Sequence, residues 1–411
     1  MSNNVFRVNT FSFRLRRKLQ EHLASNPTGL SLLKYIIKWC FIKLCQKGTN
    51  LFVSPPQIPI ENNIVKIAVK ITGGLGDYIV LGRVLKDLLT YIGNSEFYIF
   101  VPNTKYAEWL FQNMPEVKEV YPEHLLDKCL QYFDCCLHLN TLVFFNEQHI
   151  NVQKIKKTAP RLLEVFDNTV RKRRNWNIFI DNHPVLDGAF ARQVVALGYN
   201  RYSFIHHCLG IPNSGNSFNI QYSDEEAKVV ADKFKHYITL NTGFDHQFVI
   251  GSRFATKCYP VKYWETLVGL VKNRYPELGI IQIGGKNSPT IKGCDVHYEN
   301  KLSLSLSAGV LKKSLLHIDI EGGLVHLCAA LGTKCVVLFG PTSKKYFAYP
   351  ENINIQVGEC HNCWWASERW MECCPQGLDV PQCMYQLLPE TVYEHISVFL
   401  KNQGICDDCK A

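Results

Sequence analysis

The sequence has little that would place the protein across a membrane or outside the cell. Its N-terminus shows no cleavable signal pattern, because the first apolar stretch is interrupted by Arg14, Arg16 and Arg17. A strongly apolar run over residues 30–44 is too short and too rich in lysine to span a bilayer. We therefore expect a reducing, cytoplasmic setting in which the 17 cysteines are thiols rather than disulfides.

Most of the chain also lacks an excess of charge. The formal net charge is +9, and residues 1–50 hold nine Lys and Arg against one acidic residue, Glu21. The first 50 residues therefore carry +8, and the rest of the chain carries about +1. A body this close to neutral argues against nucleic acid as a partner.

The basic character belongs to an N-terminal extension, residues 1–60, which ends in a proline-rich linker. Within it, the run 30–44 places Trp39 and Phe41 beside lysines, a pattern typical of helices that lie in a membrane interface. This interpretation predicts peripheral contact with an anionic membrane, on the cytoplasmic face of the inner membrane. Packing of the same helix on the protein's own body explains the pattern equally well.

Beyond the extension, strand-like and helix-like patterns alternate through two halves of the chain, residues 61–215 and 216–395, before a tail over 396–411. The patterns predict strands over 65–72, 97–102, 134–139, 237–241 and 279–284, and helices over 76–91, 104–113, 223–235 and 261–274. Such alternation is typical of parallel sheets covered by helices. The sequence therefore predicts an α/β protein with two Rossmann-like domains.

A glycine-rich turn, Gly73 to Asp77, follows the first predicted strand and precedes a helix. This order places a ligand-facing crevice at the carboxyl end of the strand. The turn lacks the full Gly-x-Gly-x-x-Gly spacing, so it is a poor match to a dinucleotide fingerprint. Asp77 stands at the helix start, either as a partner of the positive helix end or as a carboxylate presented to a substrate.

A second glycine-rich turn follows Glu321. Gly322 and Gly323 precede a helix over 324–331, and an apolar strand over 335–339 comes next. Free N–H groups and partial positive charge at a helix N-terminus suit phosphate. Glu321 can accept hydrogen bonds from sugar hydroxyls, and His326 lies within reach of the same anion. The alternative is an ordinary buried α/β turn with a packed histidine.

Five segments in order resemble glycosyltransferase family 9, the lipopolysaccharide heptosyltransferase family. They are GGLGD at 73–77, NRY at 200–202 running into LGIP at 209–212, TKCYP at 256–260, IGG at 283–285, and EGGLVHLCAALGT followed by LFGPT within 321–342. Together they extend over roughly residues 64–395. Two positions depart from the family pattern: Glu321-Gly322-Gly323 replaces Asp-Ser/Thr-Gly, and Tyr259 replaces Trp. A longer acid and a missing hydroxyl change the expected donor pocket.

The resemblance implies a GT-B fold, in which two facing Rossmann-like domains hold the active site in the cleft between them. It implies inverting transfer of a sugar, with ADP-heptose the leading donor, to a lipopolysaccharide-core or related anionic or lipid-linked glycan. Asp77 would be the general base, and Lys257 would neutralise charge on the departing diphosphate. The donor-binding residues would be Gly74, Gly76, Thr256, Glu321, Gly322, Gly323 and His326. No cofactor is expected for the chemistry, consistent with the lack of an Asp-x-Asp metal motif at a strand end.

Cysteines cluster between residues 360 and 383. Four thiolates can hold zinc or iron in a tetrahedral shell, so we predict a structural metal bound by Cys360, Cys363, Cys374 and Cys383, with Cys373 as the alternative to Cys374. A similar four-cysteine site occurs in a protein-heptosylating branch of the family that the chain resembles. Reduced buried thiols are the other interpretation. Cys406 and Cys409 form a second, weaker pair.

Two other functions stay open. One is transfer of a different nucleotide-linked sugar to a capsule, glycan or protein acceptor. The other is a protein that binds sugar nucleotides or acts as a scaffold at the membrane without turnover. Basic residues between 154 and 174 suit an acceptor rich in phosphate or carboxylate, although a solvated surface explains them more simply.

Overall fold

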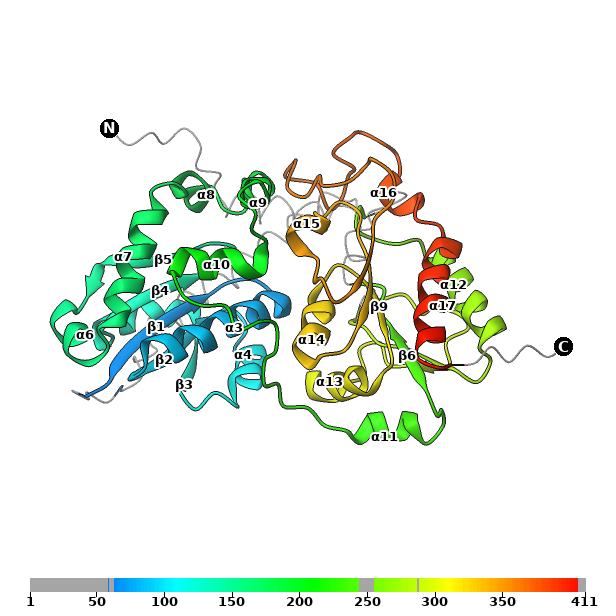
Figure 1. Ribbon diagram of the computed structural model, residues 1–411, viewed down its shortest axis with the longest axis horizontal. Helices are drawn as coiled ribbons and strands as arrows, with labels where there is room; N and C mark the ends of the chain where they lie inside the picture. Colours follow the sequence, from blue (N-terminus) through cyan, green and yellow to red (C-terminus); the bar gives the residue numbers. More distant parts are fainter. Residues whose placement is uncertain (1–57, 59–62, 244–254, 287, 406–411) are drawn as a thin grey trace, which may run out of the picture.

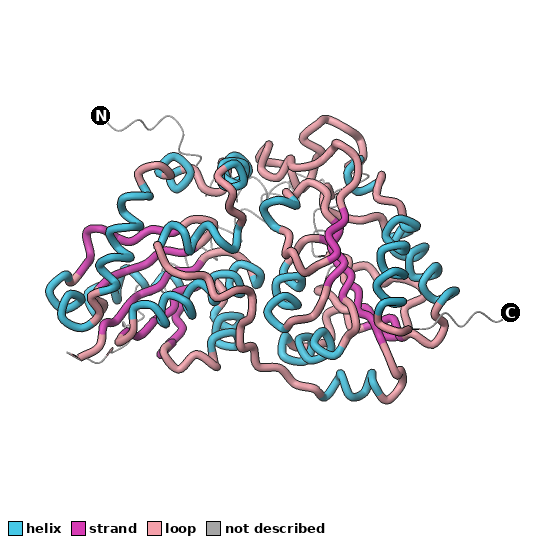
Figure 2. Tube along the Cα trace, in the orientation of Figure 1, coloured by secondary structure: helices cyan, strands magenta, loops and turns pink. Residues whose placement is uncertain are grey.

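The computed structural model describes residues 58, 63–243, 255–286 and 288–405. The helix predicted over 30–44, most of the proline-rich linker and the pair Cys406–Cys409 lie outside the described residues. Within the described part, the chain forms two β-sheets with helices packed around them, as expected for an α/β protein (Figure 1; strands are magenta in Figure 2).

The N-terminal half is built on a five-stranded sheet in the order β3-β2-β1-β4-β5. Its strands are β1 (Val65–Ile71), β2 (Ser95–Val101), β3 (Val117–Pro122), β4 (Cys135–Leu139) and β5 (Val143–Ile150). The predicted strands 65–72, 97–102 and 134–139 are confirmed. The sheet departs from the predicted parallel pattern at β5, which runs antiparallel to β4. Only residues 140–142 join these strands, too few for the crossover that a parallel pair needs.

Helices pack around this sheet. They are α3 (Leu75–Ile92), α4 (Thr104–Phe111), α5 (Leu126–Cys129), α6 (Val152–Thr158), α7 (Arg161–Arg173), α8 (Asn177–Asp181), α9 (Asp187–Ala196) and α10 (Arg201–Leu209). The predicted helices 76–91 and 104–113 correspond to α3 and α4. Helix α3 buries an apolar face that includes Ile79, Leu81, Val84, Leu85 and Leu88. This burial fixes the helix that follows the first glycine-rich turn.

The C-terminal half contains a six-stranded sheet in the order β11-β10-β9-β6-β7-β8. All of its strand pairs are parallel: β6 (Tyr237–Leu240), β7 (Gly279–Gln282), β8 (Val296–His297), β9 (His317–Ile320), β10 (Cys335–Leu338) and β11 (Ile353–Ile355). The helices are α11 (Glu225–Ala231), α12 (Val261–Arg274), α13 (Leu304–Lys313), α14 (Gly323–Leu331), α15 (Lys344–Phe347), α16 (Gln382–Tyr385) and α17 (Pro389–Asn402). The elements predicted over 223–241, 261–284 and 324–339 are therefore present.

Helix α17 corrects the predicted boundary between the second domain and the tail. We expected the second domain to end at residue 395, but α17 continues to Asn402 and packs against α12. The reason is its apolar face, since Val392, Ile396 and Leu400 are all buried in the core of the C-terminal half. The boundary predicted at 395 therefore falls inside a packed helix.

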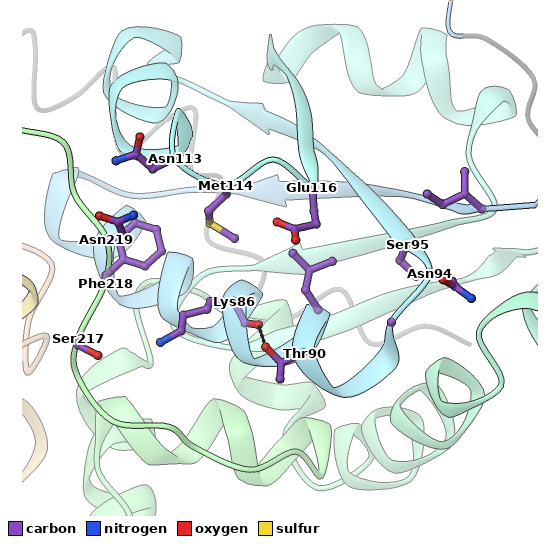
Figure 3. A pocket seen from close by; sticks show the side chains of 13 residues that line it. Lys86, Thr90, Asn94, Ser95, Asn113, Met114, Glu116, Ser217, Phe218 and Asn219 are labelled. Atoms are coloured by element: carbon purple, nitrogen blue, oxygen red, sulfur yellow. Dashed lines mark hydrogen bonds between the residues drawn. The ribbon is translucent and has the colours of Figure 1, made fainter.

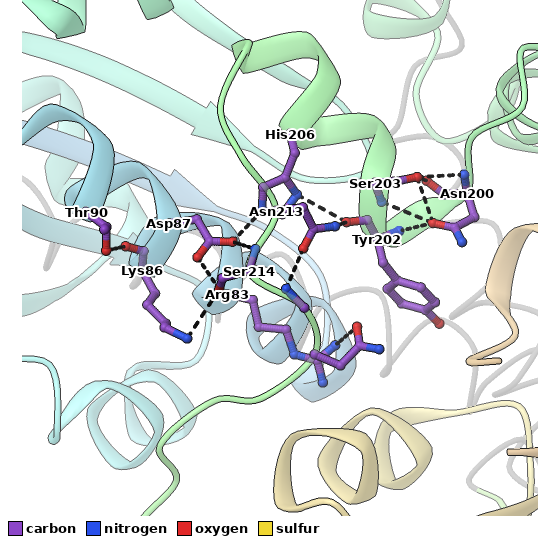
Figure 4. Close-up of polar contacts among 12 residues, drawn as sticks. Arg83, Lys86, Asp87, Thr90, Asn200, Tyr202, Ser203, His206, Asn213 and Ser214 are labelled. Carbon is purple, nitrogen blue, oxygen red and sulfur yellow. Dashed lines mark hydrogen bonds and ion pairs between the residues drawn. The ribbon is translucent and has the colours of Figure 1, made fainter. Parts of the chain in front are cut away.

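The two halves lie side by side and are joined by the segment 210–224, between α10 and α11 (Figure 1). Ser214 ties the first part of this segment to the N-terminal half, because its backbone N–H donates to Asp87 of α3 at 3.0 Å. Nε2 of His206, on α10, lies 2.9 Å from the same carboxylate (Figure 4). Helices α3 and α14 pack against each other across the interface. Among the described residues, no helix has the length and apolar character needed to cross a membrane.

Candidate active site

A cavity of about 800 Å³ lies between the two halves and collects most of the predicted site residues. The N-terminal half contributes Gly74, Leu75, Gly76, Asp77, Tyr106 and Arg201 to its lining. The C-terminal half contributes, among others, Asn241, Gly284, Gly285, Glu321, Gly322, Gly323 and His326. Because the turns containing these residues follow β1, β6, β7 and β9, the cavity lies at the carboxyl ends of both sheets, where α/β proteins bind ligands.

The two glycine-rich turns, predicted separately, face each other across the domain interface. A Cβ atom on Gly76 would lie 2.4 Å from Cδ2 of His326 and 3.3 Å from Cα of Gly323. Gly73 has φ +119°, a conformation that favours glycine, and a Cβ there would lie 2.2 Å from the Asp77 carboxylate. Glycine at position 76 lets the two turns approach closely, and glycine at position 73 lets Asp77 fold back within its own turn.

Asp77 has one of the two roles that the sequence left open, that of a partner of the helix end, and it also lines the cavity. Its Oδ2 accepts a hydrogen bond from the N–H of Gly74 at 2.7 Å, which caps the start of α3. Its Oδ1 forms an ion pair with Nη2 of Arg201, and the residue lines the cavity. The carboxylate is therefore a helix cap and a charged group presented to the cleft.

Arg201 lines the cavity, although no role was predicted for it from the sequence. It begins α10, is only 7% exposed, and its Nε is buried without a hydrogen-bond partner among the described residues. Although burial opposes its charge, Asp77 and neighbouring tyrosines raise the pKa of Arg201, so it stays cationic. Asp77 is 124 residues away in sequence, so no local pattern could reveal this pair.

Glu321, at the carboxyl end of β9, lies between a cation and a histidine. Its Oε2 is 3.1 Å from Nζ of Lys257, and its Oε1 is 3.9 Å from Nε2 of His326. The side chains of all three are largely buried. Lys257 is not among the residues that line the cavity, but it is paired with Glu321, which lines it together with His326, and the three residues form one polar wall.

His326 is held in this wall by Tyr349, whose hydroxyl lies 2.8 Å from Nδ1 of the imidazole. Burial lowers the pKa of His326 well below its usual value, and the charges of Arg201, Arg83 and Lys257 lower it further. His326 is therefore a neutral imidazole near pH 7.

Thr256, predicted to bind the donor, is not among the residues that line the cavity. Its hydroxyl donates to the carbonyl oxygen of Trp370 at 2.6 Å, and its N–H donates to the carbonyl oxygen of Met371 at 3.1 Å. Both acceptors belong to the cysteine-rich segment. Thr256 thus anchors that segment to the rest of the C-terminal half, and its contact with a donor stays a prediction.

The cysteine-rich segment gathers its thiols without forming a ligand shell. Burial, followed by the charges of Cys374 and Cys360, raises the pKa of Cys363 to about 11, and burial and the same neighbours also raise the pKa of Cys383. The four thiols therefore lie within electrostatic reach of one another. Yet the described residues contain no group of three or more His, Cys, Asp or Glu arranged to hold a metal ion. We assign no chemical step to a metal.

Asn241 is a second site residue that the sequence did not indicate. Its Nδ2 donates to both carboxylate oxygens of Asp319 at 3.0 Å, and Nε2 of His317 lies 3.3 Å from Oδ2 of the same carboxylate. These bonds fix the amide at the floor of the cavity. The only local signal is a polar residue at the end of the predicted strand 237–241.

A second cavity, of about 710 Å³, lies beside the amino ends of β1 and β2 (Figure 3). Its polar lining includes Lys86, Thr90, Ser95 and Glu116. None of the predicted site residues is in its lining, and the glycine-rich turn is at the other end of β1. The interdomain cavity is therefore the candidate active site.

Comparison with known proteins agrees with this geometry. The model of glycosyltransferase family 9 (heptosyltransferase) matches residues 170–375, half of the chain. The chain belongs to glycosyltransferase family 9. No curated protein matches it at a significant level.

Solved structures of similar fold include other members of this family. A glycosyltransferase family 9 protein of Veillonella parvula is 14% identical, with a TM-score of 0.53 over 84% of this chain and 100% of that one. ADP-heptose lipopolysaccharide heptosyltransferase II of E. coli is 14% identical, with a TM-score of 0.51 over 83% and 100%. The iron-containing dodecameric glycosyltransferase TibC of enterotoxigenic E. coli is 13% identical, with a TM-score of 0.54 over 85% and 83%. The chain thus has the two-domain GT-B fold of heptosyltransferases.

Proposed function

We propose that this protein is an inverting glycosyltransferase that moves heptose from ADP-heptose onto a lipopolysaccharide-core or related surface glycan. The observation that carries the proposal is the pairing of two charged walls across one cavity. Asp77 and Arg201 stand on the N-terminal half, and Glu321 and His326 stand on the C-terminal half. The choice of donor is supported by the fold relatives, since TibC has been solved with ADP-D-β-D-heptose.

The C-terminal wall would bind the donor. Gly322 and Gly323 open the nine-residue helix α14, whose free N–H groups and partial positive charge favour a diphosphate. Lys257 would add a positive charge as the diphosphate departs. Glu321 would accept hydrogen bonds from hydroxyls of the donor sugar.

The N-terminal wall would activate the acceptor. Asp77 would take the proton of the acceptor hydroxyl while the oxygen forms a bond to the anomeric carbon of the donor. The bond between that carbon and the diphosphate breaks, and the nucleoside diphosphate leaves with the electron pair. Attack opposite the leaving group inverts the configuration. Arg201 would hold the Asp77 carboxylate in place before the proton is transferred.

We also propose that the basic N-terminal extension brings this cleft to an anionic membrane, where a lipid-linked acceptor would be found. The support is the concentration of positive charge in residues 1–50 together with the apolar run 30–44.

One structural observation also fits a non-catalytic function. Asp77 caps Gly74, so a protein that only binds sugar nucleotides would also have a reason to retain this carboxylate. The presence of Asp77 alone therefore does not separate an enzyme from a binding protein. A transfer assay does.

The test is a thermal-shift panel of nucleotide sugars with ADP-, UDP- and GDP-linked donors, followed by a transfer assay with the donor that binds. A ligand at 100 times its dissociation constant stabilises the folded state by about 2.7 kcal/mol. Stabilisation by ADP-heptose above the other donors is the expected result. Binding of another nucleotide sugar would change the donor, and binding without turnover would identify a binding protein.

A further inference from the structure

A chain of hydrogen bonds connects the N-terminal half to His326. Nη1 of Arg83, on α3, donates to the hydroxyl of Tyr349 at 3.0 Å, and Nη2 donates to the carbonyl oxygen of His326 at 3.2 Å. The Tyr349 hydroxyl in turn lies 2.8 Å from Nδ1 of His326. Arg83 is 3% exposed, Tyr349 1% and His326 5%. In Figure 4, Arg83 extends from α3 beside the interdomain segment at Ser214. The chain is therefore shielded from solvent.

The direction of each hydrogen bond follows from the chemistry of its members. A guanidinium has only donors, so the oxygen of Tyr349 must accept from Arg83. The Tyr349 hydroxyl proton is then available for Nδ1 of His326. Tyr202 stacks on the Tyr349 ring at 4.1 Å, and its hydroxyl, which donates to the carbonyl oxygen of Phe347, also hydrogen-bonds with that of Tyr349. Because an imidazole nitrogen is a stronger acceptor than a phenol oxygen, the Tyr349 proton goes to Nδ1 of His326, which leaves the histidine proton on Nε2.

The position of that proton matters because His326 is neutral. An imidazolium could donate from both nitrogens, whereas a neutral imidazole has a single N–H. Nε2 faces the cavity, 3.9 Å from Oε1 of Glu321 and next to Gly76, where a Cβ would lie 3.2 Å away. With its proton on Nδ1 instead, His326 would turn a lone pair toward the Glu321 carboxylate and toward any bound phosphate.

We infer that Arg83 and Tyr349 are positioning residues that fix His326 as its Nε2–H tautomer, so that a neutral histidine offers a hydrogen bond to the anionic diphosphate of the donor. The use of this N–H by a diphosphate rests on the proposed function, whereas the tautomer is a property of the protein alone. Arg83 belongs to the helix that follows the first glycine-rich turn, so the N-terminal half sets the hydrogen-bonding state of a residue in the donor wall.

The direct test is ¹⁵N NMR of the full chain with labelled histidine, because ring-nitrogen shifts separate protonated from unprotonated nitrogens. His326→Gln identifies the signals of His326. We expect a protonated Nε2 and an unprotonated Nδ1 in the ligand-free protein near pH 7. The reverse assignment, or an imidazolium, would overturn the inference, and this measurement needs no change at Tyr349 or Arg83.

Variants then test the cause. Tyr349→Phe should shift the His326 signals toward the Nδ1–H tautomer. Tyr237→Phe is the matched control, because this buried tyrosine donates its hydroxyl to the carbonyl oxygen of Val310 and has no contact with His326. Arg83→Lys keeps the charge but loses the paired donors, and we expect a partial shift. Unchanged His326 signals in both Tyr349→Phe and Arg83→Lys would refute the role of the chain.

A kinetic measurement separates this inference from the proposed function. For Tyr349→Phe we expect donor KM to rise about tenfold with kcat little changed, as when a hydrogen bond to a charged group is weakened. An unchanged KM with a shifted tautomer would refute the contact with the diphosphate. If no nucleotide sugar binds even the unaltered protein, the proposed function fails while the NMR result stands.

Discussion

Both glycine-rich turns lead from a strand into a helix, but the N-termini of the two helices are capped differently. In the N-terminal half, Asp77 reaches back to the N–H of Gly74, so the protein itself provides the anion at the start of α3. In the C-terminal half, no side chain among the described residues caps α14 at Gly322. Helix N-terminal N–H groups need acceptors. The comparison indicates that the first turn presents a carboxylate to the cleft and the second is open to an external anion.

The largest expected effect comes from removing the anion of the first turn. Asp77→Asn should all but abolish transfer. The transfer rate should fall about 10²–10⁴-fold, as expected for loss of a general base, and donor binding should stay nearly intact. Steady-state kinetics and donor titration measure the two effects. Asp167→Asn, on an exposed position of α7, is the control and should behave as the unaltered protein. Turnover of Asp77→Asn at the normal rate would rule out Asp77 as the base.

A smaller effect is expected from removing the cation beside the second turn. Lys257→Ala leaves Glu321 without its partner at 3.1 Å and removes a charge that would face the diphosphate. We expect weaker donor binding and slower transfer, together about 10–100-fold in kcat/KM for a lost charged hydrogen bond. Lys262→Ala, at an exposed position of α12, controls for the change in net charge. Kinetics like those of the unaltered protein would mean that Lys257 does not act on the donor.

Filling the gap between the turns tests their close approach. Gly76→Ala places a methyl group 2.4 Å from Cδ2 of His326, and such overpacking costs about 1–3 kcal/mol. Denaturant unfolding should show this loss together with weaker donor binding. Gly269→Ala is the matched control, because a Cβ at this position of α12 has open space and should stabilise the helix slightly. Equal stability of the two variants would contradict the packing.

The cysteine-rich segment is tied to the C-terminal half through Thr256 and approaches the N-terminal half at Gly188, where a Cβ would lie 2.0 Å from the carbonyl oxygen of Trp364. Although the described residues form no ligand shell, the thiols are electrostatic neighbours, and we predict that about one equivalent of zinc or iron per chain draws together Cys360, Cys363, Cys383 and either Cys373 or Cys374. Elemental analysis of protein purified without a histidine tag measures it. Cys383→Ser should lose the metal, whereas Cys294→Ser should keep it. Metal-free protein of normal stability would refute the prediction.

The smallest expected effect on transfer in solution comes from the N-terminal extension, which should act on membrane binding rather than in the cleft. Full-length protein should float with anionic vesicles at low salt, because each basic residue near such a surface contributes about 1 kcal/mol. A shortened chain that starts at Asn62 should not float. Equal behaviour of both chains would mean that the apolar run 30–44 packs on the enzyme. Neutral vesicles and high salt are the controls for an electrostatic attraction.

The sequence predicts the elements beside the glycine-rich turns, misses others such as β3, β5 and α13, and predicts the contacts between elements poorly. Strands such as 65–72 and helices such as 261–274 are visible because burial imposes a regular apolar pattern on them. Both glycine-rich turns are also visible, since they directly follow apolar strands. Their mutual contact is not, because it depends on how two domains pack.

The missed residues illustrate the same limit. Arg201 and Asp77 are far apart in sequence. Arg83 contacts His326 only because helices α3 and α14, which belong to different halves, pack together. Thr256 shows the limit in another way, because proximity to Lys257 in sequence says nothing about where its hydroxyl points. The hydroxyl turns to Trp370, a contact made by a loop more than a hundred residues later.

The contact between Gly76 and His326 also constrains how this protein can change by mutation. A side chain at position 76 fits only if position 326 becomes smaller, so the two sites should show strong epistasis. Under the proposed function, in which His326 contacts the donor, neither substitution would be neutral, which makes the pair a barrier to gradual drift. In a descendant released from that function, position 326 could change first and position 76 after it. A double substitution at 76 and 326 would then be an inherited record of lost activity.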